Sequence, residues 1–241
     1  MAVQHRYNPA YIHHKEGRTV HNMREIVFGM QDGMVSTLGA VTGIAVGSGD
    51  IFVVLLSGIA IIAVESISMG IGSYTSSRSE KKLMERQLDE ECQEIIEFPQ
   101  YEKSELRDFF IRDGWSRETA DAMIAEASKN KSLMLREMAY RELHVSPDKS
   151  EHPVENGVYM FVAYIIGGLI PLSVYFFLPL PFAIKVSVAI TLAGLFVLGA
   201  VIGSFTKEMW YKAGIHMFLF GGVALLAGYL VGALSHVITG F

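Results

Sequence analysis

Two carboxylates lie inside long stretches that are otherwise nearly free of charge. Asp32 is the one acid in residues 26–49, and Glu65 is the one acid in residues 51–77. A carboxylate at the centre of a bilayer costs about 2.5–3.5 kcal/mol, and such residues usually face a protein interior or a water-filled path. We therefore interpret both as candidates for a path through a membrane. The alternative for Asp32 is a position near the membrane surface, where water solvates it.

Met69 follows Glu65 by four residues, so the two side chains share one face of a helix. A carboxylate and a thioether offer one hard and one soft ligand. This combination suits a transition metal better than Ca²⁺ or Mg²⁺. The alternative is that Met69 simply fills an apolar core.

A second group of acids lies between the charge-poor stretches. Two Glu-x-x-Glu pairs flank Pro99, and the spacing puts both carboxylates of a pair on one helix face. A helical hairpin would bring four acids together, as in di-iron bundles, and they would repel one another unless a cation neutralised them. Each pair alone is also typical of a solvated acidic face. The candidate metal ligands here are Glu91, Glu94, Glu102, Glu105, Met138 and Glu142.

The composition indicates the elements that must position these residues. The chain has 241 residues, is 51% hydrophobic and is only 19% charged, where soluble domains average about 25%. Five stretches are long enough for a helix to cross about 30 Å of hydrocarbon. They do not show the alternation of a membrane β-barrel. The sequence therefore predicts an all-α polytopic membrane protein with five transmembrane helices, at residues 26–49, 51–77, 156–184, 186–206 and 213–241.

The polar insert between the second and third spans is predicted to be helical. Residues 78–97 lack Gly and Pro and should continue the second span out of the membrane. Pro99 should break that helix. Three further helices are expected at residues 101–112, 116–130 and 132–144. The predicted organisation is an N-terminal tail (1–25), two spans (26–77), the insert (78–155) and three spans (156–241).

The distribution of charge predicts the topology. Residues 75–157 contain 19 acids and 13 bases, whereas the rest of the chain contains 6 acids and 7 bases. Lys and Arg gather in the tail, the insert and the loop after residue 206, which are the ends that the positive-inside rule places in the cytoplasm. We expect the N-terminus and insert to be cytoplasmic and the C-terminus to lie outside. A basic domain for nucleic acid is absent.

Other chemistry is less well supported. The single Cys92 cannot form an internal disulfide. The chain has no Walker loop, dinucleotide fingerprint, nucleophile elbow or Cys-x-x-Cys motif, so we predict that it is not an enzyme. The tail residues His13, His14 and His21 could bind metal, but histidines in tails usually have no specific role. A membrane oxidase with a di-iron centre is a further alternative, and the lack of a Glu-x-x-His pair in the insert argues against it.

Several runs of residues resemble the vacuolar iron transporter family. They are Arg24-Glu-Ile-Val-Phe-Gly-Met-Gln-Asp-Gly-Met-Val35 in the first span, Glu65-Ser-Ile-Ser-Met-Gly-Ile-Gly-Ser-Tyr74 with Ser79-Glu-Lys81 in the second, and Gly167-Gly-Leu-Ile-Pro171 in the third. The insert keeps the family's placement of its glutamates around Pro99. The resemblance covers nearly the whole chain and is closest to prokaryotic members.

The resemblance implies a homodimer of five-helix subunits, formed through the first transmembrane helix, that exchanges cytosolic Fe²⁺ for protons. Asp32 and Met69 match the family's path, and the six ligand candidates of the insert match its metal-binding domain. An acid near the cytosolic mouth is replaced by His21, with Glu25 one turn later. The sequence departs from plant members at two positions. Ala139 replaces a methionine, and Ile61 replaces the acid of the second span, whereas the acid in this chain is Glu65, one helical turn later.

We therefore hypothesise a proton-coupled Fe²⁺ transporter in a prokaryotic plasma membrane that moves iron out of the cytosol. Asp32 and Glu65 would alternate between metal and protons, and the insert would capture metal. Mn²⁺, Zn²⁺ and Co²⁺ are alternative substrates. The rival hypothesis is a membrane-anchored iron-binding, storage or sensor protein without transport, for which the two intramembrane acids would be an unnecessary cost.

Overall fold

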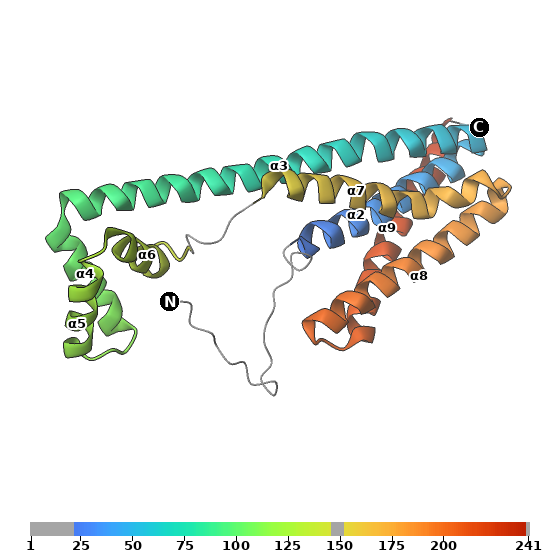
Figure 1. The fold of residues 1–241 in the computed structure, drawn as a ribbon. Helices are drawn as coiled ribbons and strands as arrows, with labels where there is room; N and C mark the ends of the chain where they lie inside the picture. The colour runs from blue at the N-terminus through green and yellow to red at the C-terminus, as the bar shows by residue number, and fades with distance from the viewer. Residues whose placement is uncertain (1–21, 146–151, 240–241) are drawn as a thin grey trace, which may run out of the picture. The chain divides into compact units, whose positions relative to one another are not determined.

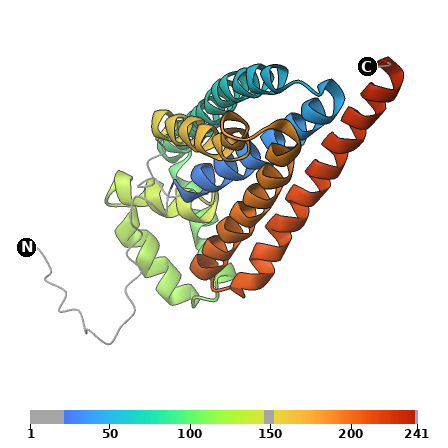
Figure 2. The same ribbon diagram turned by 90° about the vertical axis from the view of Figure 1, so that its right-hand side faces the viewer.

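The computed structural model describes residues 22–145 and 152–239, and every secondary-structure element in them is a helix (Figures 1 and 2). The all-α class predicted from the sequence is thus confirmed. The chain divides into two compact units, Met1–Ser73 with Val154–Phe241 and Tyr74–Pro153. The elements are α2 (Met23–Ser48), α3 (Ile51–Glu97), α4 (Pro99–Arg112), α5 (Arg117–Ala127), α6 (Lys131–Arg141), α7 (Pro153–Ser173), the short 3₁₀ helix η1 (Val174–Phe176), α8 (Leu180–Thr206) and α9 (Trp210–Thr239).

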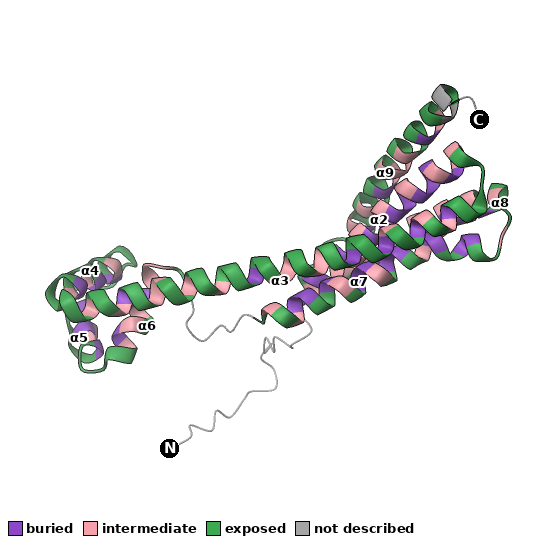
Figure 3. Ribbon diagram, turned by 90° about the horizontal axis from the view of Figure 1, so that it is seen from above, coloured by how far each residue is buried: buried purple, intermediate pink, exposed green. Residues whose placement is uncertain are grey.

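Within the described residues, four helical segments are long and apolar enough to cross a membrane: α3, α7 with η1, α8 and α9. These helices carry large exposed apolar side chains, such as Val64 and Val223, which are 66% and 68% exposed. Figure 3 shows exposed residues in green along these helices. Helix α2 is long enough but less apolar, because it contains Gln31, Asp32 and many small polar residues. The predicted count of five spans therefore remains a prediction where α2 is concerned.

Helix α2 contacts α8 and α9 of the first unit, and many of its residues are buried. Glycines also let it approach α7 closely. A Cβ atom placed on Gly29 would lie 2.8 Å from the main-chain O of Met160, and one on Gly33 would lie 2.8 Å from the N of Gly168. This is the close packing typical of small residues in membrane helices. The small-residue spacing of the first span therefore serves helix contacts within one chain.

The helix boundaries differ from the sequence prediction at the end of the third stretch. Residues 156–184 were expected in one span, but α7 and η1 end at Phe176 and α8 begins at Leu180. The reason is the pair of prolines at this turn. Pro179 occupies the N-cap of α8 in an extended conformation, and Pro181 lies in its first turn, where the fixed φ of proline favours helix initiation. Lys185 consequently lies within α8.

The second unit contains the polar end of α3 together with α4, α5 and α6. Helix α3 runs without interruption to Glu97, as the sequence predicted, and α4 begins at Pro99. Ser116 caps α5 through the N–H of Thr119, and Asn130 caps α6. The core of this unit consists of Leu106, Phe110, Ala120, Ile124, Ala127, Met134 and Met138. The three helices after Pro99 thus close a small apolar core around their own side chains.

Arg141 ties the end of α6 to α4. Its guanidinium lies over the ring of Phe110, 4.3 Å from the centroid, and it pairs with Asp113 and Glu137. Stacking and two carboxylate partners together hold a cation that is largely removed from water. This arrangement positions the segment that carries Met138 and Glu142.

Candidate functional site

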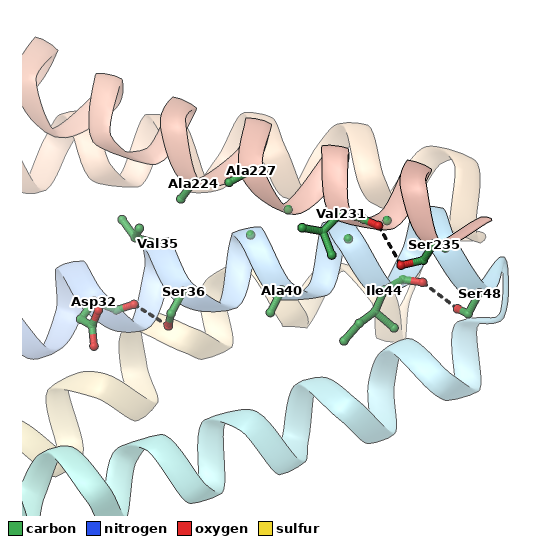
Figure 4. A pocket seen from close by; sticks show the side chains of 15 residues that line it. Asp32, Val35, Ser36, Ala40, Ile44, Ser48, Ala224, Ala227, Val231 and Ser235 are labelled. Carbon is green, nitrogen blue, oxygen red and sulfur yellow. Dashed lines mark hydrogen bonds between the residues drawn. The ribbon is translucent and has the colours of Figure 1, made fainter. Parts of the chain in front are cut away.

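A groove runs along helices α2 and α9 of the first unit (Figure 4). Its volume is about 750 Å³, and Gly, Ala and Val supply most of its wall. The polar residues that line it are Asp32, Ser36, Ser48 and Ser235. Asp32 is the only ionisable residue among the residues that line this groove. The groove therefore presents one carboxylate in apolar surroundings.

Small residues bring the two helices together beneath the groove. A Cβ atom on Gly39 would lie 3.0 Å from the main-chain O of Ala224, and one on Gly43 would lie 2.6 Å from that of Gly228. Neither neighbour is a flexible side chain that could move away. The backbones can approach this closely only because these positions lack side chains. Asp32 and Ser36 line the α2 side of this groove.

Asp32 on α2 and Glu65 on α3 lie close enough for their negative charges to interact. Asp32 is half-buried, whereas Glu65 is exposed on the surface of the single chain. The two acids that the sequence singled out in its apolar stretches thus both belong to the first unit, on neighbouring segments of the chain, α2 and α3.

Ser36 and Tyr164 belong to the same place, and sequence reasoning missed both. Tyr164 on α7 is fully buried, and its Oη lies 2.7 Å from Ser36 Oγ. The charges of Asp32 and Glu65 act electrostatically on its hydroxyl. Two signals were available in the sequence. Ser36 lies one helical turn after Asp32, and a tyrosine buried in an apolar span needs a partner for its hydroxyl.

Glu25 lies on the same helix as Asp32, and Met69 lies on α3. Glu25 lies seven residues before Asp32 on α2, which is about 10 Å along the helix axis. It is buried, and it pairs with Arg24 at 3.7 Å. Met69 is half-buried on α3, one turn beyond Glu65. The structure thus places Glu25 nearer one end of α2 and leaves Met69 on the helix face of Glu65.

Three glutamates of the second unit converge. Glu91 on α3 and Glu102 on α4 are 3% and 5% exposed, and Glu142 follows α6. Burial, followed by the charges of Glu142 and Glu102, raises the pKa of Glu91 to about 8. Burial also raises the pKa of Glu102 and of Glu142. Each of the three has one buried carboxylate oxygen without a hydrogen-bond partner. We call Glu91, Glu102 and Glu142 the glutamate cluster.

The other three candidates of the insert lie around the glutamate cluster. Glu94 and Glu105 are exposed, and their charges act on Glu102 and Glu142. Met138 is fully buried in the apolar core of the unit. Within the described residues, no three His, Cys, Asp or Glu side chains are arranged to hold a metal ion. The tail residues His13, His14 and His21 lie outside the described residues.

The pattern of acids, spans and insert agrees with comparisons to known proteins. Residues 23–233 match the model of the VIT family. The chain belongs to the VIT family. The match covers α2 and the glutamate cluster, and it reaches into α9. The match confirms the resemblance of the sequence motifs to the vacuolar iron transporter family.

Proteins with similar sequences include vacuolar iron transporters of plants and of Toxoplasma gondii. Vacuolar iron transporter 1 of Tulipa gesneriana is 30% identical over 86% of this chain and 84% of its own length. The protein of the same name in Arabidopsis thaliana is 28% identical over 86% and 83%. The vacuolar iron transporter of Toxoplasma gondii is 29% identical over 94% of this chain and 80% of its own length.

Proposed function

We propose that this chain transports divalent metal ions across a membrane, with Fe²⁺ as the substrate, and that it exchanges the metal for protons. Membership of the VIT family and the names of the relatives support metal ion transport rather than catalysis. The observation that carries the proposal is the pair Asp32 and Glu65. Two interacting carboxylates in apolar helices are costly unless they bind a cation or a proton.

In this mechanism Asp32 and Glu65 hold either one divalent cation or protons. A divalent cation neutralises both carboxylates, and two protons do the same, so the two occupants compete for one site. Met69, one turn from Glu65, supplies a soft thioether that favours Fe²⁺ over Mg²⁺ and Ca²⁺. Mn²⁺, Zn²⁺ and Co²⁺ are alternative substrates. Glu25 lies two turns before Asp32 on the same helix and would bind the cation at the cytosolic entrance of the path.

The exposure of Glu65 supports the formation of a homodimer. A carboxylate on a membrane-spanning helix is unfavourable against lipid, and Glu65 is exposed in the single chain. A second copy placed along α2 would cover Glu65 and convert the α2–α9 groove into an enclosed path. The fifth span is α2 itself, whose polar residues fit a helix enclosed by protein rather than one in contact with lipid.

The second unit captures metal before transport. The glutamate cluster, with Glu94, Glu105 and Met138, would concentrate a cation on the cytosolic side. Burial and the charges of its neighbours raise the pKa of Glu91 to about 8, so that the glutamate cluster would bind protons as well as a metal ion. A metal ion would displace these protons. The positive-inside pattern supports an N-terminus and a second unit in the cytoplasm and a C-terminus outside, and the proposed location is a prokaryotic plasma membrane.

The test is Fe²⁺ uptake into proteoliposomes. Wild-type protein should take up Fe²⁺, and Asp32→Ala should not. Asp50→Asn is the matched control, because Asp50 is an exposed acid at the end of α2. Uptake by Asp32→Ala equal to that of wild type would refute the proposed path. A storage protein would instead bind Fe²⁺ without moving it, and substitution of the glutamate cluster would then abolish all retention.

A further inference from the structure

The hydroxyl of Ser36 lies in the groove next to Asp32, one helical turn further along α2 (Figure 4). Ser36 Oγ has two polar neighbours. It donates a hydrogen bond to the main-chain O of Asp32 at 2.7 Å, and it lies 2.7 Å from Tyr164 Oη. Both distances are typical of O–H···O hydrogen bonds. The direction of the second bond decides what Ser36 can offer to the groove.

The direction follows from counting hydrogens. A serine hydroxyl has one hydrogen and two lone pairs, whereas a carbonyl oxygen can only accept. The Ser36 hydrogen is therefore committed to the main-chain O of Asp32. Tyr164 must then donate its own hydrogen to Ser36 Oγ. Ser36 Oγ keeps one lone pair and has no hydrogen left to donate.

The position of Tyr164 is fixed by backbone packing. Tyr164 is fully buried, and its main-chain O lies against Gly33, so close that a Cβ atom there would overlap it. Gly167 lies equally close to the main-chain O of Met30. Because two glycines allow α2 and α7 to meet at this point, the Tyr164 hydroxyl reaches Ser36. The hydrogen bond is therefore held by the closest part of the α2–α7 contact.

A hydroxyl that has only a lone pair to offer suits a cation. Hard oxygen atoms are ligands for divalent metals, and the Asp32 carboxylate next to Ser36 offers the same type of atom. We propose that Ser36 Oγ is a further ligand of the transported cation beside Asp32, and that Tyr164 is a positioning residue that keeps Ser36 as an acceptor. This inference rests on the proposed transport function and adds to it a ligand on α2.

The first test compares Fe²⁺ transport by Ser36→Ala and by Ser204→Ala. Ser204 makes the same bond to a main-chain O four residues earlier, but on the exposed face of α8. We expect Ser36→Ala to raise KM for Fe²⁺ about tenfold and to leave kcat nearly unchanged, since a lost ligand weakens binding. Ser204→Ala should leave both constants unchanged. A lower kcat at constant KM in Ser36→Ala would indicate structural damage and overturn the proposal.

The role of Tyr164 is tested by Tyr164→Phe, with Tyr175→Phe as its control. Both tyrosines are fully buried in the first unit, and Tyr175 is not among the residues that line the groove. We expect Tyr164→Phe to raise KM about threefold, which corresponds to one hydrogen bond of ordinary strength. Tyr175→Phe should leave KM unchanged. Equal effects of the two variants would assign Tyr164 to packing alone.

The sharpest readout is metal preference. Ser36→Cys replaces a hard oxygen with a soft sulfur of similar size, and soft ligands favour Cd²⁺. If Ser36 contacts the cation, Cd²⁺ should compete with Fe²⁺ about tenfold more strongly in Ser36→Cys than in wild type. Ser204→Cys should not show this change. Unchanged competition by Cd²⁺ in Ser36→Cys would contradict the assignment of Ser36 as a ligand.

Failure of this inference can be separated from failure of the proposed function. If wild-type protein moves no Fe²⁺, the transport function itself is wrong. If wild type transports Fe²⁺ and Asp32→Ala does not, while all Ser36 variants behave as wild type, only the ligand role of Ser36 is refuted. The same protein preparations serve both comparisons.

Discussion

The carboxylates of Asp32 and Glu65 stand on two different helices and lie close enough for their charges to interact. Neither carboxylate has a lysine or arginine partner among the ion pairs of the described residues. Two like charges in apolar surroundings repel each other and lose hydration. A cation shared by the two would relieve both costs. This relationship is the physical basis of the transport proposal.

Glu65→Gln should reduce Fe²⁺ transport by at least about 100-fold. Mutation of a residue that only supports a metal ligand typically lowers metal affinity by about 10–100-fold, and loss of a charged ligand itself should cost more. The measurement is the initial rate of Fe²⁺ uptake into proteoliposomes. Glu85→Gln is the matched control, because Glu85 is exposed on the polar part of the same helix. If Glu65→Gln retains the wild-type rate, Glu65 is not part of the path.

The stability of metal-free protein should fall as the pH rises from about 4.5 to about 8. In this range folded Glu91 keeps its proton, because its pKa is raised from 4.5 to about 8, whereas the unfolded chain has already lost it. The folded state then binds more protons than the unfolded state, so the free energy of unfolding decreases with pH. The measurement is Tm of the second unit within the full chain, recorded at several pH values.

Glu91→Gln should remove much of this pH dependence and raise Tm by several degrees at pH 8. The control is Glu97→Gln, since Glu97 is exposed at the end of the same helix. A pH profile that is the same in Glu91→Gln and wild type would show that another group is responsible.

Met138→Leu should separate metal binding from packing. Met138 is fully buried in the core of the second unit, and Met→Leu conserves volume, so we expect a loss of less than about 1.5 kcal/mol in the free energy of unfolding. If the thioether binds metal, Fe²⁺ affinity should fall about tenfold. Met134→Leu changes the same residue type in the same core and should leave affinity unchanged. Equal affinities of the two variants would make Met138 a packing residue only.

Gly43→Ala should destabilise the first unit by about 1–3 kcal/mol, as overpacking does. The new Cβ atom would lie 2.6 Å from the main-chain O of Gly228, which cannot rotate away. Gly72→Ala is the control, because a Cβ atom at that position meets nothing within 4 Å. Thermal unfolding in detergent measures both. A wild-type Tm for Gly43→Ala would mean that α2 and α9 can separate without cost.

Much of the fold could be predicted from the sequence, because charge-free stretches and breaker residues are local signals. Pro99 and the capping residue Ser116 marked the helices of the insert. The predicted stretch 156–184 runs past the start of α8 at Leu180, because apolar residues continue on both sides of the proline turn. Within the described residues four helical segments meet the length and hydropathy of a span, and the fifth span, at α2, stays a prediction, because Gln31 and Asp32 make this helix less apolar.

The candidate site was predicted in part. Asp32 and Glu65 stood out because charges are rare in apolar helices. Their proximity depends on how α2, α3 and α7 pack, which no local pattern encodes. Ser36 and Tyr164 were not predicted as site residues, because serine and tyrosine are common in membrane spans. Only the 2.7 Å contact between their hydroxyls in the folded chain links them to the site. The burial of Met138 in an apolar core was likewise a property of the packed unit.

The most direct test of the central claim measures metal and proton movement together. Proteoliposomes with an acidic lumen and a pH-sensitive dye inside are given external Fe²⁺ while uptake is recorded. We predict that Fe²⁺ enters and that lumenal pH rises at the same time, and that both changes are absent in Asp32→Ala. Fe²⁺ entry without any change in lumenal pH would contradict proton exchange, and binding of Fe²⁺ without entry would contradict transport.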